Sequence, residues 1–130
     1  MTVATDSGTI IREGYERFAQ QDVPGVLALF SSDIIWTIPG PSALAGEYHG
    51  PEGVGEFFGK IAQTWDRLEV HPSEMLVDGD RVVVLGHHEI ELGGSTYEVP
   101  FVHAWRLENG RPISFEEYLD TARLEGLLAS

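Results

Sequence analysis

The tightest constraint in this chain is the dipeptide Asn109-Gly110, which separates two β-rich runs. Asn-Gly favours a two-residue type I′ turn, because both residues accept the positive φ angles that this turn requires. Residues 99–107 and 112–119 are therefore predicted to form an antiparallel hairpin. Counted outward from the turn, the register leaves Pro112 where no ladder hydrogen bond is needed, which suits a residue without an N–H group.

The hairpin register places ionisable groups on one face of the sheet. His103 is predicted opposite Glu116 in a non-hydrogen-bonded pair, where Cα atoms approach to about 4.5 Å. Imidazole titrates near neutrality, so Glu116 would orient the ring or act as a base itself. A β-bulge would replace Glu116 by Glu117 on this face. Asp120 shares the face but also precedes Thr121-Ala-Arg-Leu as a helix N-cap, and both roles are open.

The whole chain reads as one α+β domain of 130 residues, with a short flexible tail at residues 1–6. Caps and helical periodicity predict helices over about 7–21, 26–30, 51–65 and 120–128. Strands are predicted over 34–38, 67–77, 81–92, 95–107 and 112–119, and the segment from 39 to 50 is expected to be a loop.

Charge and composition exclude several classes of partner. Eight basic and 21 acidic residues give a formal charge of −13, which would repel nucleic acid and anionic membrane surfaces. No run approaches the roughly 20 apolar residues of a membrane span, and no signal peptide is evident at the start. The chain has no cysteine, which fits a reducing compartment. We expect a cytoplasmic protein.

Four segments together carry a family resemblance: 15–33, 36–40, 46–54 and the hairpin that runs into Asp120-Thr-Ala122. They resemble the NTF2-like superfamily, and within it the SnoaL-like branch related to ketosteroid isomerases. The resemblance implies a cone in which N-terminal helices pack on a curved, mostly antiparallel sheet around an apolar cavity. It also implies a homodimer packed through the sheet. The apolar reverse face of the predicted hairpin supports that contact, with Val102, Ala104, Ile113, Phe115 and Leu119.

The same resemblance argues against steroid isomerisation by the known mechanism. Ketosteroid isomerases, a standard example of pKa tuning, use an Asp base with an oxyanion hole of Tyr and protonated Asp. Matching the family places Gly14 at the Tyr position, Ile38 at the Asp base and His103 at the oxyanion-hole Asp. The His-Trp-Asp motif of related polyketide cyclases is also absent. So is the arginine of the epoxide hydrolases, whose place Phe101 takes.

Apolar and aromatic residues on the same faces are expected to line the cavity and to suit a small apolar or aromatic molecule. These are Tyr15, Trp36, Ile38, Phe58, Phe101, Trp105 and Tyr118. The chain is therefore expected to be a cofactor-free acid/base enzyme of the isomerase, cyclase, hydrolase or dehydratase type, with His103, Glu116 and Asp120 in its site. The alternative is a noncatalytic small-molecule-binding or dimerisation domain on the same fold.

No metal site is expected from residue spacing. Adjacent strand residues point to opposite faces, so His87 and Glu89 can act together, or His88 alone. A metal-dependent oxygenase would need His87, Glu89 and His103 to converge. The enzyme hypothesis gains if His103 is buried beside a cavity near a carboxylate, with no other group completing its bonding. It fails if His103 faces solvent or is fully bonded in a closed core.

Overall fold

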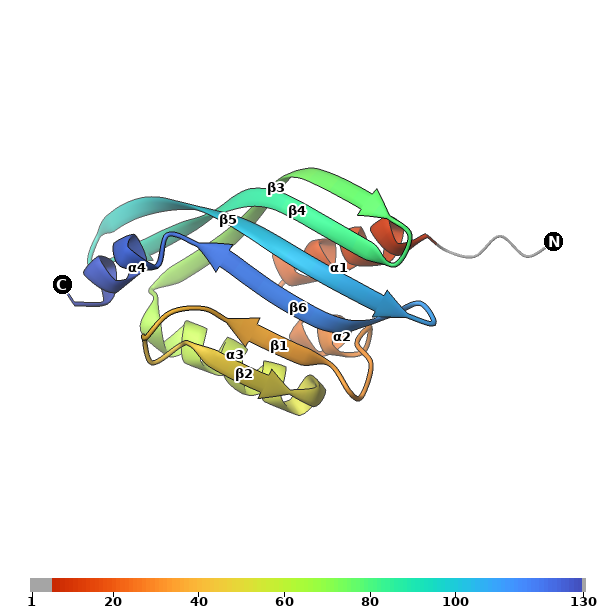
Figure 1. Cartoon of the computed structure of the whole chain (residues 1–130). Helices are drawn as coiled ribbons and strands as arrows, with labels where there is room; N and C mark the ends of the chain where they lie inside the picture. Colours follow the sequence, from red (N-terminus) through yellow and green to blue (C-terminus); the bar gives the residue numbers. More distant parts are fainter. Residues whose placement is uncertain (1–5, 130) are drawn as a thin grey trace.

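The computed structural model describes residues 6–129, so most of the predicted tail lies outside the described residues. Within this range four helices and six strands follow one another (Figure 1). They are α1 (Ser7–Ala19), α2 (Val23–Leu27), β1 (Ile35–Ile38), β2 (Gly46–His49), α3 (Gly50–Thr64), β3 (Arg67–Asp78), β4 (Arg81–Leu92), β5 (Ser95–Glu108), β6 (Arg111–Leu119) and α4 (Thr121–Leu128). None of these helices is both long enough and apolar enough to span a membrane.

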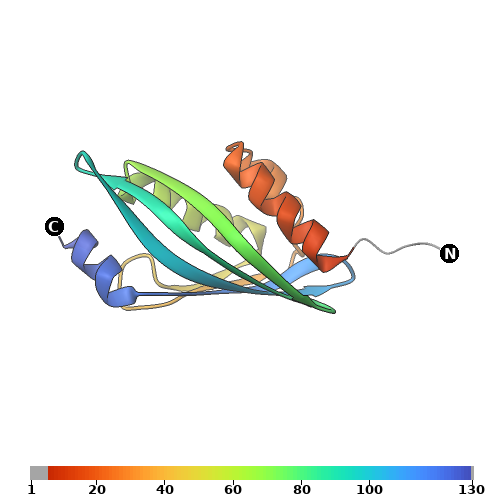
Figure 2. The same ribbon diagram turned by 90° about the horizontal axis from the view of Figure 1, so that it is seen from above.

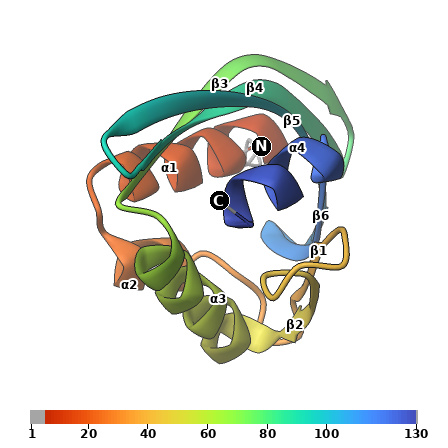
Figure 3. The same cartoon turned by 90° about the vertical axis from the view of Figure 1, so that its left-hand side faces the viewer.

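The strands form one curved sheet in the order β2-β1-β6-β5-β4-β3. Every pairing is antiparallel except the parallel pair β1–β6. Helices α1 and α3 lie on the same side of this sheet (Figure 2). Helix α4 lies at one end of the molecule, and in the view onto that end the sheet and the first three helices frame it (Figure 3). This arrangement confirms the predicted α+β cone, which leaves its sheet open rather than closing it into a barrel.

Local chemistry explains where the first two helices begin. The Asp6 carboxylate accepts a hydrogen bond from the Thr9 N–H at 2.9 Å and so caps α1. Asp22 caps α2 in the same way, accepting from the Gly25 N–H at 3.0 Å, with Pro24 in the first turn. The second helix therefore begins at Val23, three residues before the predicted start, because the cap precedes the apolar run.

The segment predicted as a loop between residues 39 and 50 contains strand β2. It pairs antiparallel with β1, and Gly46 lies opposite Ile38. Only Tyr48 of its four residues is buried. So short a strand shows no alternation of apolar and polar residues, and the sequence carries no signal for it.

The predicted turn is confirmed, but the register beyond it is wrong by one residue. Asn109 and Gly110 have φ angles of 52° and 75°, as a type I′ turn requires. The pairing then shifts between Arg106 and Leu107, because β6 carries a bulge at Ile113. As a result, His103 lies opposite Glu117 instead of the predicted Glu116.

This bulge also exchanges the two faces of β6. Phe115 and Glu117 are buried, whereas Tyr118 is 53% exposed and its hydroxyl donates a hydrogen bond to Glu116. Tyr118 and Glu116 are thus on the outer face, and the predicted cavity-wall position of Tyr118 is wrong. Phe115 and Leu119 line the cavity, so they do not contribute to the apolar outer face that was predicted for dimer contact.

Strand β3 has its own bulge between Pro72 and Glu74, next to Gly86 of β4. A Cβ atom added at Gly86 would lie 2.3 Å from the His71 carbonyl oxygen and 2.8 Å from the Phe101 ring. Backbone and a packed ring leave no room, so only glycine fits there.

Replacing Gly86 by alanine should therefore destabilise the fold by about 1–3 kcal/mol or more, because overpacking forces backbone shifts. Gly59→Ala is the matched control, since its added Cβ would meet no described atom within 4 Å on an exposed helix position. That control should stabilise by ~0.5–1 kcal/mol. Urea unfolding of both variants measures the difference, and equal stability of the two would contradict the packing described for Gly86.

Candidate functional site

A cavity of about 100 Å³ lies between the concave face of the sheet and the helices. Its wall is mostly aliphatic and aromatic. Five of the predicted wall residues do line it: Tyr15, Trp36, Ile38, Phe58 and Trp105. Phe101 is buried but is not among the lining residues, and its ring stacks on that of His103 with centroids 3.7 Å apart. Leu124 of α4 also contributes to the wall, which ties the C-terminal helix to the cavity.

Three buried ionisable side chains meet at one point of this wall. The Nε2 atoms of His103 and His88 lie 2.9 Å and 2.7 Å from the same Glu117 oxygen, Oε2. The exposed fractions are 4% for His103, 9% for His88 and 8% for Glu117. The residues come from β5, β4 and β6, so the central strands of the sheet bring them together.

Tyr15 of α1 completes the bonding of His103 from the helical side. Its hydroxyl lies 2.7 Å from His103 Nδ1, and the Trp105 indole N–H donates to the Tyr15 oxygen at 3.1 Å. Because Trp105 can only donate, the Tyr15 hydroxyl is free to donate its own proton to His103 Nδ1. That pattern assigns the remaining ring proton of neutral His103 to Nε2, from which it is donated to Glu117.

Burial and hydrogen bonding set the protonation of the cluster. Burial opposes ionisation of Glu117, but hydrogen bonds from His103 and His88 outweigh it and lower its pKa to about 2. Burial lowers the pKa of His103, against the opposing effect of Glu117. The pKa of Tyr15 is raised by burial and by the charge of Glu117, although the Trp105 hydrogen bond opposes the rise. The site therefore holds an ionised carboxylate beside a neutral imidazole and a neutral phenol.

Two buried side-chain atoms of residues that line the cavity have no hydrogen-bond partner among the described residues. They are His88 Nδ1 and Trp36 Nε1. Within the described chain, Glu117 with the two imidazoles is also one of two groups that could hold a metal ion, since its three donor atoms lie within 4.8 Å of one another. The set His87, Glu89 and His103 does not converge, because the first two point to the outer face.

Asp120 acts as a helix cap. Its carboxylate accepts from the Arg123 N–H at 3.0 Å, which makes it the N-cap of α4, and its side chain is exposed. The structure thus places His103 near a carboxylate, but that carboxylate is Glu117, with Glu116 outside and Asp120 capping a helix.

Sequence reasoning missed two members of this cluster, His88, which bonds Glu117, and Tyr15, which bonds His103. His88 was weighed only as an isolated histidine, and Tyr15 only as part of the apolar wall. Strand alternation does put His88 on the inner face, but nothing in the sequence says that its ring reaches Glu117. Tyr15 and His103 are 88 residues apart in the sequence, so their contact depends on how α1 packs on the sheet.

The structure meets two of the three conditions that were set for His103 in the enzyme hypothesis. His103 is buried beside a cavity and bonded to a carboxylate, as the enzyme hypothesis requires. Tyr15 completes the bonding of His103, so the condition that no other group should do so is not met. Because Tyr15 itself lines the cavity, the hydrogen-bonded chain from Glu117 still reaches the space where a ligand would lie.

Comparison with known proteins places this architecture in a family. The model of the SnoaL-like domain matches residues 11–114. The chain belongs to the SnoaL-like domain family, within the NTF2-like superfamily. No curated protein matches it.

Solved structures resemble this SnoaL-like domain over nearly its whole length. An NTF2-like protein of unknown function from Burkholderia pseudomallei K96243 is 35% identical, with a TM-score of 0.90 over 98% of this chain and 100% of that one. TerC, co-crystallised with polyporic acid, is 30% identical, with a TM-score of 0.90 over 97% and 100% of the two chains. Bal32a, from a soil-derived mobile gene cassette, is 25% identical, with a TM-score of 0.87 over 94% and 95%.

The pKa values predict how the SnoaL-like domain responds to acid. The pKa of Glu117 falls from 4.5 to about 2 on folding, so its contribution to stability is present above pH 4.5 and is lost between pH 4.5 and 2. Glu117→Gln should cost ~3–5 kcal/mol at neutral pH, because it breaks a buried charged cluster. It should also flatten the pH dependence of stability in that acid window.

Chemical denaturation from pH 7 to pH 2 measures both effects. Glu116→Gln is the control, because Glu116 is the neighbouring carboxylate on the exposed face. Its stability should parallel that of the wild type at every pH. A Glu117→Gln protein as stable as the Glu116→Gln protein would contradict the account of the buried carboxylate.

Proposed function

We propose that this SnoaL-like domain is a cofactor-free acid/base enzyme that removes or relays a proton on a small apolar or aromatic molecule. The single observation that carries the proposal is the hydrogen-bonded chain Glu117–His103–Tyr15, which ends at the wall of an apolar cavity. Groups arranged in such a series, with an ionised carboxylate behind a neutral imidazole, are those that general acid/base catalysis needs.

The hydrogen-bonded series Glu117–His103–Tyr15, called the relay below, supplies a path for one proton. A substrate proton would pass to the Tyr15 oxygen as the Tyr15 proton passes to His103 Nδ1. His103 would then be an imidazolium whose charge is balanced by the Glu117 carboxylate, 2.9 Å from Nε2. Tyr15 is the group that would touch the substrate, and Glu117, His88 and Trp105 are positioning residues.

The surroundings of the relay favour such a transfer. Desolvation by the cavity wall strengthens electrostatic interactions within it. Burial also raises the pKa of Tyr15, so the phenol stays protonated and serves as a proton carrier instead of a resident base. The proton acceptor is therefore the imidazole, held neutral by burial.

The apolar wall indicates the class of molecule. Trp36, Phe58 and Trp105 offer flat aromatic surfaces, on which aromatic rings or fused rings pack well. TerC, a 30% identical relative, has been crystallised with polyporic acid. Polyporic acid is therefore the first ligand to test for binding in this cavity, through the fluorescence of the tryptophans in the wall.

Activity can be measured with a probe that needs only a base. In 5-nitrobenzisoxazole, removal of the C3 proton forms a nitrile as the N–O bond breaks, and a coloured nitrophenolate is released. His103→Gln should slow this reaction by about 10²–10⁴-fold, the usual contribution of a positioned general base. Tryptophan fluorescence with the same probe shows whether the cavity is still occupied.

Tyr15→Phe distinguishes the relay from direct attack by His103. It should lower the rate at saturating probe by roughly 10²-fold if the proton travels through the phenol oxygen. A rate that rises would mean that Tyr15 only covers His103, and the relay would be wrong. Glu116→Gln, on the outer face, should retain the wild-type rate, and a wild-type rate no higher than that of His103→Gln would contradict the enzyme proposal.

The pH dependence of this reaction follows from the position of His103. Burial holds the pKa of His103 below its ordinary value of 6.5, so the base form persists and the acid limb of the rate profile should lie below pH 6.5. Glu117 raises that pKa, so Glu117→Gln should move the limb to still lower pH. A limb above pH 6.5, or an upward shift in the variant, would contradict this assignment.

Noncatalytic binding on the same scaffold is the second candidate. The observation that favours it is the full bonding of both His103 nitrogens, which leaves no free ring atom for a substrate. Tight binding of polyporic acid without any rate above that of His103→Gln would support it. A homodimer through the sheet and a cytoplasmic location stay predictions.

A further inference from the structure

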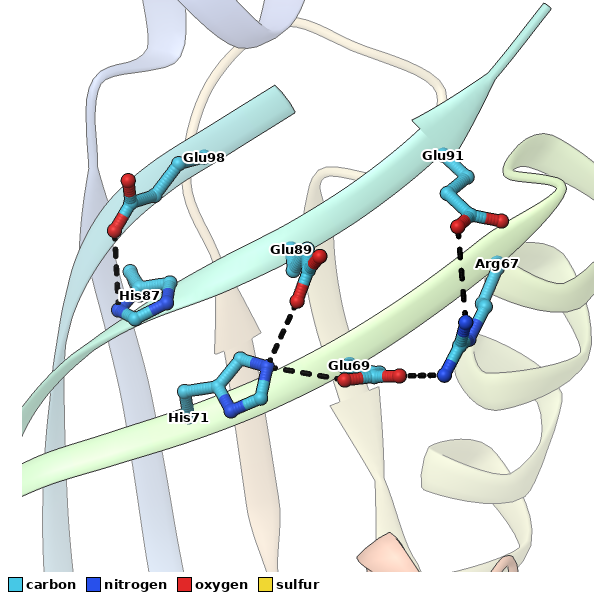
Figure 4. Close-up of polar contacts among 7 residues, drawn as sticks. All are labelled: Arg67, Glu69, His71, His87, Glu89, Glu91 and Glu98. Atoms are coloured by element: carbon cyan, nitrogen blue, oxygen red, sulfur yellow. Dashed lines mark hydrogen bonds and ion pairs between the residues drawn. The ribbon is translucent and has the colours of Figure 1, made fainter. Parts of the chain in front are cut away.

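A second group of metal-ligating side chains lies on the outer face of the sheet (Figure 4). Glu69 of β3 is opposite Glu89 of β4, which is in turn opposite Glu98 of β5. In the next row His71 of β3 is opposite His87 of β4. Neighbouring residues along β3 and β4 line the cavity, so strand alternation directs the four side chains of these two strands away from it. Glu98 shares their face because it lies directly opposite Glu89.

The donor atoms converge on His71. Its Nε2 lies 3.1 Å from Glu69 Oε2 and 3.1 Å from Glu89 Oε2. All three ligand atoms lie within 4.8 Å of one another. Ligands bonded to a metal at about 2.0–2.2 Å are themselves about 2.8 to 3.6 Å apart in octahedral or tetrahedral geometry. Both nitrogen–oxygen distances fall within that interval.

We propose that Glu69, His71 and Glu89 form a binding site for a divalent transition-metal ion of the Zn²⁺ type. The electrostatics support a cation there. Like charges directly opposite on neighbouring strands destabilise a sheet, yet Glu69 and Glu89 are such a pair, with Glu98 beyond them. The single hydrogen that Nε2 can carry serves two carboxylates poorly, whereas a divalent ion would bind all three donors and neutralise both charges.

The surroundings hold the ligands in position. Arg67 forms an ion pair with the second Glu69 oxygen, Oε1, which leaves Oε2 directed at His71. The His87 ring stacks on that of His71 with centroids 5.0 Å apart, and its Nδ1 lies 3.4 Å from Glu98. Such outer contacts orient metal ligands and tune their basicity.

Access and ligand type indicate which ions would bind. The side chains of Glu69, His71 and Glu89 are 34%, 42% and 44% exposed, so an ion can reach the site from solvent and keep water at its remaining positions. One imidazole with two carboxylates suits Zn²⁺ and Co²⁺, whereas Mg²⁺ and Ca²⁺ prefer oxygen ligands alone. The sequence analysis, which expected no metal site, did not consider this group, because it weighed Glu89 only together with His87 on the same strand.

The site can be tested on the full chain with the metals alone. Calorimetric titration with ZnCl₂ and the visible absorption of added CoCl₂ should each show one ion per chain at pH 7. His71→Gln and Glu89→Gln should weaken binding by at least about tenfold.

Two control variants make the result specific to this cluster. His49 also lies near a carboxylate, Glu47 at 3.3 Å, on an exposed surface, so His49→Gln tests whether any exposed pair binds the ion. His103→Gln removes a ligand of the buried cluster, which is the other candidate within the described residues. Both controls should bind Zn²⁺ as the wild type does.

Each remaining outcome overturns the proposal. Absence of Zn²⁺ and Co²⁺ binding, or binding that His71→Gln leaves unchanged, would exclude the site on the outer face. Loss of the ion in His103→Gln alone would assign the metal to the buried cluster instead. Circular dichroism of every variant confirms folding, and the two independent ligand variants guard against the failure of one.

Discussion

The arrangement of the candidate site depends on one buried carboxylate, that of Glu117. Burying a charge is costly unless it is paired and hydrogen-bonded, and here two imidazole N–H groups satisfy one carboxylate oxygen. The strand that carries Glu117 reaches this position only because a bulge at Ile113 shifts its register by one residue. A local irregularity of the backbone thus decides which of two adjacent carboxylates enters the core.

The Glu117 carboxylate also fixes the hydrogen bonding of His103 and Tyr15. It accepts the Nε2 proton of His103, so the opposite nitrogen is left to accept from Tyr15, and Trp105 holds the Tyr15 oxygen in place. The apolar wall keeps water from competing for these bonds. The charge of Glu117, the tautomer of His103 and the contact of Tyr15 with the cavity are therefore linked. A substitution at Glu117 would alter the hydrogen bond between Tyr15 and the opposite side of the imidazole.

Much of the fold could be predicted from the sequence, because it rests on local signals: Asn109-Gly110 for the turn and alternation for the long strands. The site was predicted only in part. His103 was found, but the bulge that exchanges Glu116 for Glu117 leaves no firm mark in a single sequence. Contacts between distant elements, such as the hydrogen bond between Tyr15 and His103, were not predicted, because they depend on how a helix packs on the sheet.

The central claim is that His103 is a neutral imidazole with its proton on Nε2, held between a carboxylate and a phenol. Nitrogen-15 NMR of the histidine side chains measures this state directly, with His103→Gln used for assignment. The account predicts the Nε2–H tautomer at neutral pH and resistance to protonation as the pH falls below 6.5, the ordinary pKa of histidine. An imidazolium at pH 7, or a neutral ring with its proton on Nδ1, would contradict it.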